Sequence, residues 1–191
     1  MRRLFLCLVT VALVLAAPAR AGDAAAEGFV RALSDELARA GALSQDDPGA
    51  GRAAVMDIFE TAFDMRAMAL AVLPEDYRDG ADAGYVAAYA GFMADGFVAE
   101  TLAGGAGTTE ILGSRVRGAR LVLVGTRVTA EDGERRSVEW YLTPVAGSYR
   151  VINAAVSGVL VTAEQAREFR PHLAAGDMAG LMAHLSAGGR G

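Results

Sequence analysis

Cysteine and histidine are scarce in this 191-residue chain, which contains one cysteine and two histidines. Cys7 lies in the apolar N-terminal segment, whereas His172 and His184 both lie near the C-terminus. A single cysteine forms no internal disulfide, and the two histidines do not have the spacing of a metal-ligand pair. A G-x-S-x-G nucleophile motif is also absent. Packing, rather than cross-links or a metal ion, must therefore stabilise the fold.

The sequence contains one long apolar run, at the N-terminus. Two arginines precede an apolar stretch over residues 4–17, and residues 19–21 (A-R-A) have the form of a signal-peptidase site. This stretch is shorter than the roughly 20 residues of a membrane-spanning helix. A lipoprotein would need a cysteine just after it, but Cys7 lies within it, so we expect no lipid anchor. We expect a cleaved signal peptide over residues 1–21 and a soluble, exported single domain over residues 22–191.

Positive charge is in the minority, with 18 basic against 23 acidic residues and a net charge of −5. Removal of the three arginines in the expected signal peptide leaves 15 basic residues against the same 23 acidic ones, a net charge of −8. Such a chain is poorly suited to a nucleic-acid backbone, so we expect no nucleic-acid partner. Residues 22–110 are net acidic and residues 111–191 net basic. Either one end faces an anionic partner or the two halves complement each other within the fold.

Apolar side chains repeat at helical spacing in the first half of the chain. The repeats predict four helices, over about residues 24–40, 55–63, 65–72 and 82–102. Gly41 is expected to end the first of these helices, and Asp64 is expected to cap the N-terminus of the third.

The pattern changes to β-structure after the glycine-rich residues 104–107. Four segments rich in β-branched residues are predicted to be strands, over residues 111–116, 120–129, 136–143 and 148–156. Turn sequences at 131–134 and 146–147 predict consecutive hairpins. Residues 121–124 are apolar on both faces, which predicts burial on both sides. Two helices follow, and residues 162–165 (T-A-E-Q) predict a capping box at the start of the first.

Helices followed by strands indicate an α+β fold. We expect helices on one face of a curved antiparallel sheet of about four strands, an NTF2-like, cone-shaped arrangement with an apolar pocket in the trough of the sheet. Asp57, Glu60 and Asp64 fall at helical spacing, which is also typical of a solvated helix face. We predict no catalytic residue, metal or cofactor, and therefore no enzyme. An NTF2-like pocket enzyme with a buried carboxylate, and a non-enzymatic adaptor with a filled core, remain alternatives.

Several segments resemble the MlaC, or toluene-tolerance, family of periplasmic phospholipid-binding proteins. Residues 63–73 (FDMRAMALAVL) are similar to the family's F-D-x-x-x-M/I-A-x-x-x-L element, and residues 149–161 (YRVINAAVSGVLV) to its W-K-V-x-D-V-x-V-E-G-V-S-L stretch. Gln165, Arg167 and Phe169 follow where the family has N-x-R-x-x-F, and residues 176–181 resemble its G-x-x-x-L-I/L ending. The chain departs from the family pattern at Tyr149, Asn153, Ser157 and Leu160, and residues 74–80 (PEDYRDG) replace the family's short G-x-x-W-R-x-A-S sequence.

The resemblance implies a monomeric periplasmic carrier of phospholipid that serves an ABC-type lipid transport system and docks on its outer- and inner-membrane complexes. A hopanoid-type lipid is an alternative ligand. The pocket-lining positions are expected on the apolar stripes that face the trough, and they are Phe59, Phe63, Met68, Val72, Tyr89, Phe92, Met93, Val122, Val124, Val138, Trp140 and Ile152. One or more of four arginines are expected at the polar mouth, beside the lipid phosphate: Arg115, Arg117, Arg120 and Arg127.

Overall fold

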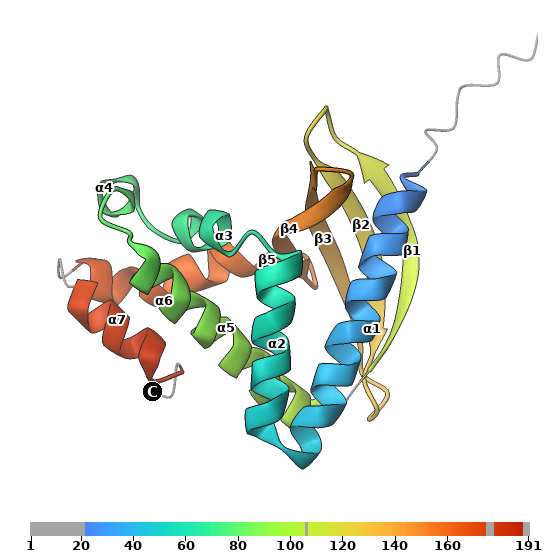
Figure 1. The fold of residues 1–191 in the computed structure, drawn as a ribbon, viewed down its shortest axis with the longest axis horizontal. Coiled ribbons are helices and arrows are strands. Elements are labelled where there is room, and N and C mark those ends of the chain that lie inside the picture. The colour runs from blue at the N-terminus through green and yellow to red at the C-terminus, as the bar shows by residue number, and fades with distance from the viewer. Residues whose placement is uncertain (1–21, 106, 175–177, 189–191) are drawn as a thin grey trace, which may run out of the picture.

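The computed structural model describes residues 22–105, 107–174 and 178–188. The expected signal peptide lies outside these residues, as do Gly176 and Asp177 of the C-terminal motif. Within the described residues, seven helices and one five-stranded sheet form an α+β fold, as predicted (Figure 1).

Helices α1 (Ala24–Asp46) and α2 (Pro48–Ala62) form an antiparallel pair, and α1 lies along the sheet (Figure 1). Asp47 joins the two helices, and its Oδ1 atom accepts hydrogen bonds of 3.0 Å from the N–H groups of Gly49 and Ala50. The expectation that Gly41 ends the first helix is wrong. A Cβ atom at Gly41 would lie 2.8 Å from the Thr101 methyl group, so this glycine allows close packing between helices instead.

Two further helices lead away from the sheet, α3 (Met65–Ala71) and α4 (Glu75–Arg78), and α5 (Ala83–Gly104) leads back to it (Figure 1). Asp64 caps α3 as predicted, because its Oδ1 atom accepts a 2.9 Å hydrogen bond from the Ala67 N–H. Asp82 caps α5 in the same way through the Tyr85 N–H. The single turn of α4 was not predicted, since four residues after a proline carry no periodic pattern.

The predicted antiparallel meander is confirmed. Its strands follow chain order from edge to edge: β1 (Thr108–Val116), β2 (Val122–Thr129), β3 (Arg135–Val145), β4 (Ser148–Val156) and β5 (Val159–Leu160). Val122, Leu123 and Val124 are all buried, in agreement with the predicted burial on both faces of β2. Strand β5 has two residues and was not expected.

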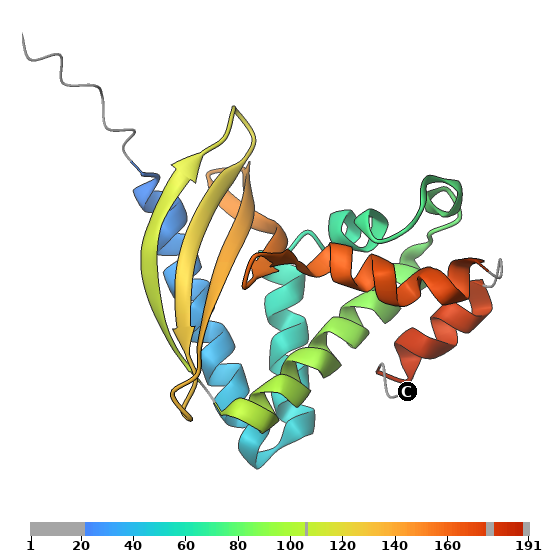
Figure 2. The same cartoon turned by 180° about the vertical axis from the view of Figure 1, so that it is seen from behind.

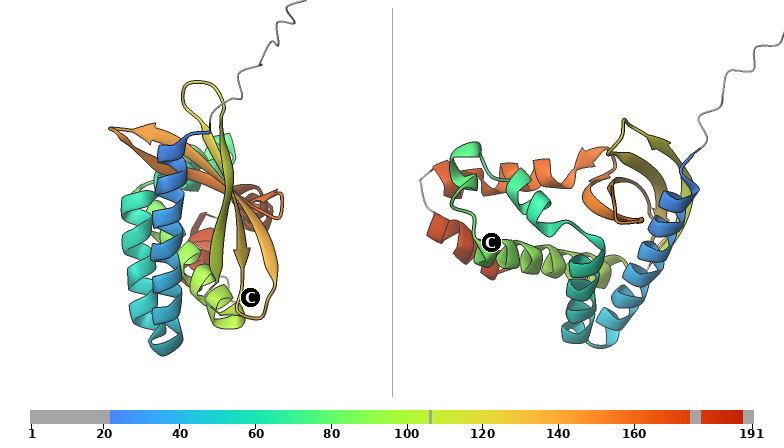
Figure 3. Two further views of the ribbon diagram at one scale, coloured as in Figure 1. Left: turned by 90° about the vertical axis from the view of Figure 1, so that its right-hand side faces the viewer. Right: turned by 45° about the horizontal axis from the view of Figure 1, so that its top comes forward.

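The chain ends in α6 (Val161–Ala174) and α7 (Met178–Ser186), which pack with the far half of α5 (Figure 2). The sheet is curved and open, with α1 and α2 on one of its faces (Figure 3). The predicted capping box is wrong, because α6 starts directly after β5 and Thr162 therefore lies inside the helix. The Thr162 Oγ1 atom instead accepts a 2.7 Å hydrogen bond from the Asn153 side chain.

None of the helices in the described parts of the chain combines the length and the apolar character that a membrane crossing requires.

Candidate functional site

The twelve predicted lining residues come from four parts of the fold: the end of α2, α3, α5 and the sheet. Eight of them are buried in one apolar cluster, and they are Phe59, Phe63, Met68, Val72, Tyr89, Val122, Val124 and Trp140. Phe92, Met93 and Val138 are partly buried and pack against that cluster. The apolar residues predicted from their spacing therefore converge, except for Ile152, on one interior cluster.

Ile152 is the exception among the twelve, because Val151 takes the core-facing position on β4. The pairing of β3 with β4 shifts between Tyr141 and Leu142, and this bulge places Val151 opposite Leu142. Val151 has no exposed surface and forms a bridge to Phe63, and its carbonyl accepts a 2.8 Å hydrogen bond from the Asp64 N–H. Val151 thus fixes the start of α3 against the sheet.

A row of aromatic rings links α2 to the sheet. Phe59 and Phe63 lie edge to face with ring centroids 4.8 Å apart, and Phe63 lies edge to face with Trp140 at 6.4 Å. The Trp140 indole N–H donates a 3.1 Å hydrogen bond to the Thr126 hydroxyl, which in turn donates to the Val138 carbonyl. These bonds satisfy the polar atoms of the row and leave its apolar surfaces for contact with other apolar groups.

The helical half of the interior contains a small buried polar group. The Tyr89 hydroxyl donates a 2.6 Å hydrogen bond to Gln165 Oε1, and Gln165 Nε2 donates to the Met93 sulfur at 2.7 Å. Burial raises the pKa of the Tyr85 and Tyr89 phenols well above their ordinary value. Both tyrosines are therefore neutral hydrogen-bond donors at any physiological pH, which suits positioning rather than acid–base chemistry.

Gln165 was not among the predicted site residues, because the T-A-E-Q sequence suggested a helix cap. The position was nevertheless visible in the spacing of α6, whose buried face consists of Thr162, Gln165, Phe169 and Leu173. A polar residue on an otherwise apolar helical stripe is a signal for a buried hydrogen bond.

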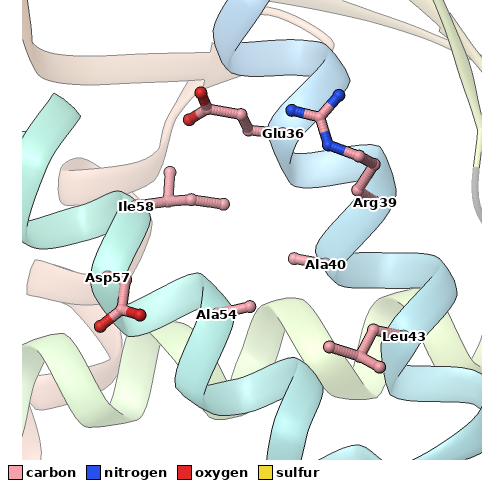
Figure 4. A pocket seen from close by; sticks show the side chains of 7 residues that line it. All are labelled: Glu36, Arg39, Ala40, Leu43, Ala54, Asp57 and Ile58. Atoms are coloured by element: carbon pink, nitrogen blue, oxygen red, sulfur yellow. The ribbon is translucent and has the colours of Figure 1, made fainter.

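Two surface concavities lie away from the predicted pocket. One, of about 260 Å³, lies between α1 and α2, where apolar Ala40, Leu43, Ala54 and Ile58 alternate with charged side chains (Figure 4). The other, of about 320 Å³, lies over β1 to β4, and of the twelve predicted residues only Val138 borders it. The predicted acyl-chain pocket therefore stays a prediction.

The candidate acidic groups lie on exposed surfaces or have structural roles. Asp57 and Glu60 are exposed on α2, and Asp64 caps α3. His172 and His184 stack at 4.8 Å between α6 and α7, and His184 Nε2 lies 2.9 Å from a Glu168 carboxylate oxygen. No group of three or more potential metal ligands occurs in the described parts of the chain.

The arginines expected at a polar mouth lie on the sheet face opposite α1 or in a hairpin loop. Arg115 forms an ion pair with Glu139, and Arg127 forms one with Glu110 at 2.7 Å. Arg117 and Arg120 lie in the exposed β1–β2 loop.

Comparison with known proteins identifies the family of this chain and solved structures that share its fold. The family model described as "MlaC protein" matches residues 27–187. The solved structure of a phospholipid-binding protein from Ralstonia solanacearum, in complex with a phospholipid, superposes with a TM-score of 0.68 at 13% sequence identity. The match covers 85% of this chain and 96% of that protein. No curated protein matches the sequence.

Proposed function

Since this chain belongs to the MlaC family, we propose that it is a periplasmic carrier that holds phospholipid by its acyl chains and moves it between the outer- and inner-membrane complexes of an ABC-type lipid transport system. The observation that carries the proposal is the family match over most of the chain. The shared fold with a protein solved in complex with a phospholipid supports it.

The physical task of such a carrier is to keep acyl chains out of water. Each methylene that leaves an apolar environment costs about 0.8 kcal/mol, so a chain of about 14 methylenes faces on the order of 10 kcal/mol. The aromatic and aliphatic side chains that converge from α2, α3, α5 and the sheet are the apolar groups with which such a site would hold acyl chains.

We propose that the acyl chains enter between α3 and α5 on one side and β3 and β4 on the other. Methionines border this region from two helices, with Met65 and Met68 on α3 and Met93 on α5. Their unbranched side chains change conformation at little cost, which supports a site that opens by rearrangement of side chains around the ligand. The headgroup would remain in water, so no cage of charged residues is required.

A non-enzymatic adaptor is the second candidate function, and the close packing of the interior favours it. Met68, Val72, Tyr89 and Val124 are each no more than 2% exposed. Such burial is typical of a filled core as well as of a closed binding site.

Native mass spectrometry of protein freshly purified from periplasm separates the two functions. The carrier is expected to show an added mass equal to one or more lipids, and organic extraction is expected to release the same molecules. The measured mass distinguishes a phospholipid from a hopanoid-type lipid. If neither method detects lipid, and phospholipid added in detergent also fails to bind, the adaptor replaces the carrier.

A further inference from the structure

One end of the sheet carries two hairpin tips side by side. Val116 pairs with Val122 around the β1–β2 loop, Val145 pairs with Ser148 around the β3–β4 turn, and Val122 pairs with Leu142 across β2 and β3. Both tips therefore project in the same direction, at the top of the molecule in Figure 1. We call residues 115–121 and 143–150 the hairpin end.

The hairpin end is basic, since its two segments contain four arginines and no acidic residue. Arg115 is paired with Glu139, and Arg150 donates hydrogen bonds to the carbonyls of Glu60 and Phe63. Arg117 and Arg120 are exposed, and in the described parts of the chain neither forms an ion pair or a side-chain hydrogen bond. These two guanidinium groups are available to an external anion.

Two acidic side chains at the start of α1, which contact Tyr149 and Ser114, are already engaged. Asp23 accepts hydrogen bonds from the Ala26 N–H and, at 2.7 Å, from the Tyr149 hydroxyl. Glu27 accepts one from the Ser114 hydroxyl, also at 2.7 Å. Neither carboxylate bonds to Arg117 or Arg120.

The hairpin end also exposes apolar side chains at its tips. Val116 is 49% exposed and Val145 is 37% exposed, and the exposed Ala119 and Ala146 lie in the adjoining turns. Ala146 and Gly147 both have positive φ, of 43° and 83°, so the β3–β4 tip is a tight turn with a defined shape. Apolar tips flanked by arginines fit the boundary between lipid headgroups and acyl chains.

The opposite end of the sheet is slightly acidic. The β2–β3 turn contains the exposed Glu131, Asp132 and Glu134, and Arg135 and Arg136 follow it, so residues 131–136 have a net charge of −1. The net charge is −5, or −8 without the expected signal peptide, so an anionic surface repels the protein overall and favours approach by the hairpin end.

We propose that the hairpin end is a contact site for membrane surfaces that contain anionic phospholipid. Arg117 and Arg120 bind lipid phosphates, while Val116 and Val145 lie at headgroup depth. This site is separate from the proposed interior site for acyl chains, and it does not require that the protein carry lipid.

Co-sedimentation with vesicles tests the contact site. The full mature protein is expected to bind vesicles of phosphatidylcholine and phosphatidylglycerol but not vesicles of phosphatidylcholine alone, and binding is expected to weaken as salt is raised. A basic residue near an anionic surface strengthens binding about fivefold, so the R117Q/R120Q double variant is expected to bind about 25-fold more weakly. Both side chains are exposed and have no side-chain partner among the described residues, so circular dichroism is expected to be unchanged.

The matched control is Arg135→Gln, which removes an exposed arginine beside the opposite, acidic turn. Its vesicle binding is expected to equal that of the parent. The contact site is wrong if R135Q weakens binding as much as the double variant does, or if the double variant binds like the parent. It is also wrong if the parent binds no anionic vesicle. Native mass spectrometry of the same variants reports co-purified lipid, so failure of this site remains distinguishable from failure of the carrier function.

Discussion

Tyr89 of α5 and Gln165 of α6 form a 2.6 Å hydrogen bond in which both side chains are buried. The bond joins the helix that leads back to β1 to the helix that directly follows β5. The bond therefore holds α6 against α5 through a polar contact within apolar surroundings. Buried hydrogen bonds of this kind define a unique arrangement because misaligned alternatives leave polar groups unpaired.

The Tyr89→Phe variant is expected to be destabilised by about 1–3 kcal/mol, because it leaves the Gln165 Oε1 atom buried without its donor. Urea unfolding of the lipid-free protein measures the change. Tyr77→Phe is the control. The Tyr77 hydroxyl also donates a 2.6 Å hydrogen bond, to the Leu173 carbonyl, but Tyr77 is only half-buried and water can replace its hydroxyl. Its loss of stability should be smaller.

A double variant sharpens this test. Tyr89→Phe combined with Gln165→Met removes both polar partners and keeps similar volumes, so it is expected to be less destabilised than the sum of the two single variants. Additive losses would show that the Tyr89–Gln165 bond does not contribute as an interacting pair.

Two glycines in helices are expected to respond oppositely to alanine. At Gly51 a Cβ atom would lie 1.9 Å from Ser44 Oγ and 2.6 Å from Ser44 Cα, so Gly51→Ala must push α1 and α2 apart and is expected to cost about 1–3 kcal/mol. At Gly96 a Cβ atom meets nothing within 4 Å, so Gly96→Ala is expected to stabilise α5 by about 0.5–1 kcal/mol. Thermal unfolding of both variants measures the difference, and equal signs would contradict the packing of α1 on α2.

The ionisation of Asp23 makes the stability of the folded protein depend on pH in the acid range. Hydrogen bonds from the Ala26 N–H and from the Tyr149 hydroxyl lower the pKa of Asp23 below its ordinary value of 3.8. A lowered pKa in the folded state means that the carboxylate contributes stability above the unfolded-state pKa, and that this contribution is lost as pH falls through the folded-state pKa.

The Asp23→Asn variant is therefore expected to be less stable than the parent at neutral pH, and the difference is expected to shrink below about pH 4. Urea titrations between neutral pH and pH 3 measure this dependence. Asp79→Asn, which changes an exposed carboxylate after α4, controls for the general effect of removing a negative charge. A difference between D23N and the parent that is constant with pH would exclude this linkage.

Local patterns predicted the strands and hairpins well, because alternation and turn residues act between neighbours in sequence. Features that depend on contacts between residues distant in the sequence could not be predicted from it. Glycine often follows the end of a helix, but Gly41 lies inside α1, where Thr101 of α5 packs against it. The bulge in β3–β4 that selects Val151 over Ile152 has no sequence signature of its own. The twelve lining positions were predicted from apolar residues repeated at helical or strand spacing. Such repeats identify side chains that face the interior, but they do not show whether that interior opens for a ligand.

Enlarged side chains at the interior distinguish an opening site from a filled core. Val124 has no exposed surface and faces the cluster shared by the sheet and helices. If acyl chains occupy this region, Val124→Trp is expected to abolish co-purified lipid, while the lipid-free protein keeps its circular dichroism and most of its stability, because the indole fills space that opens for the ligand.

Val55→Trp is the matched control, because Val55 on α2 is also fully buried but is not one of the twelve predicted lining residues. Overpacking there is expected to cost about 1–3 kcal/mol in the lipid-free protein while lipid is retained. Native mass spectrometry and urea unfolding on both variants give the comparison. If V124W is destabilised as strongly as V55W, and the parent protein never carries lipid, the interior is a filled core and the adaptor function is the correct one.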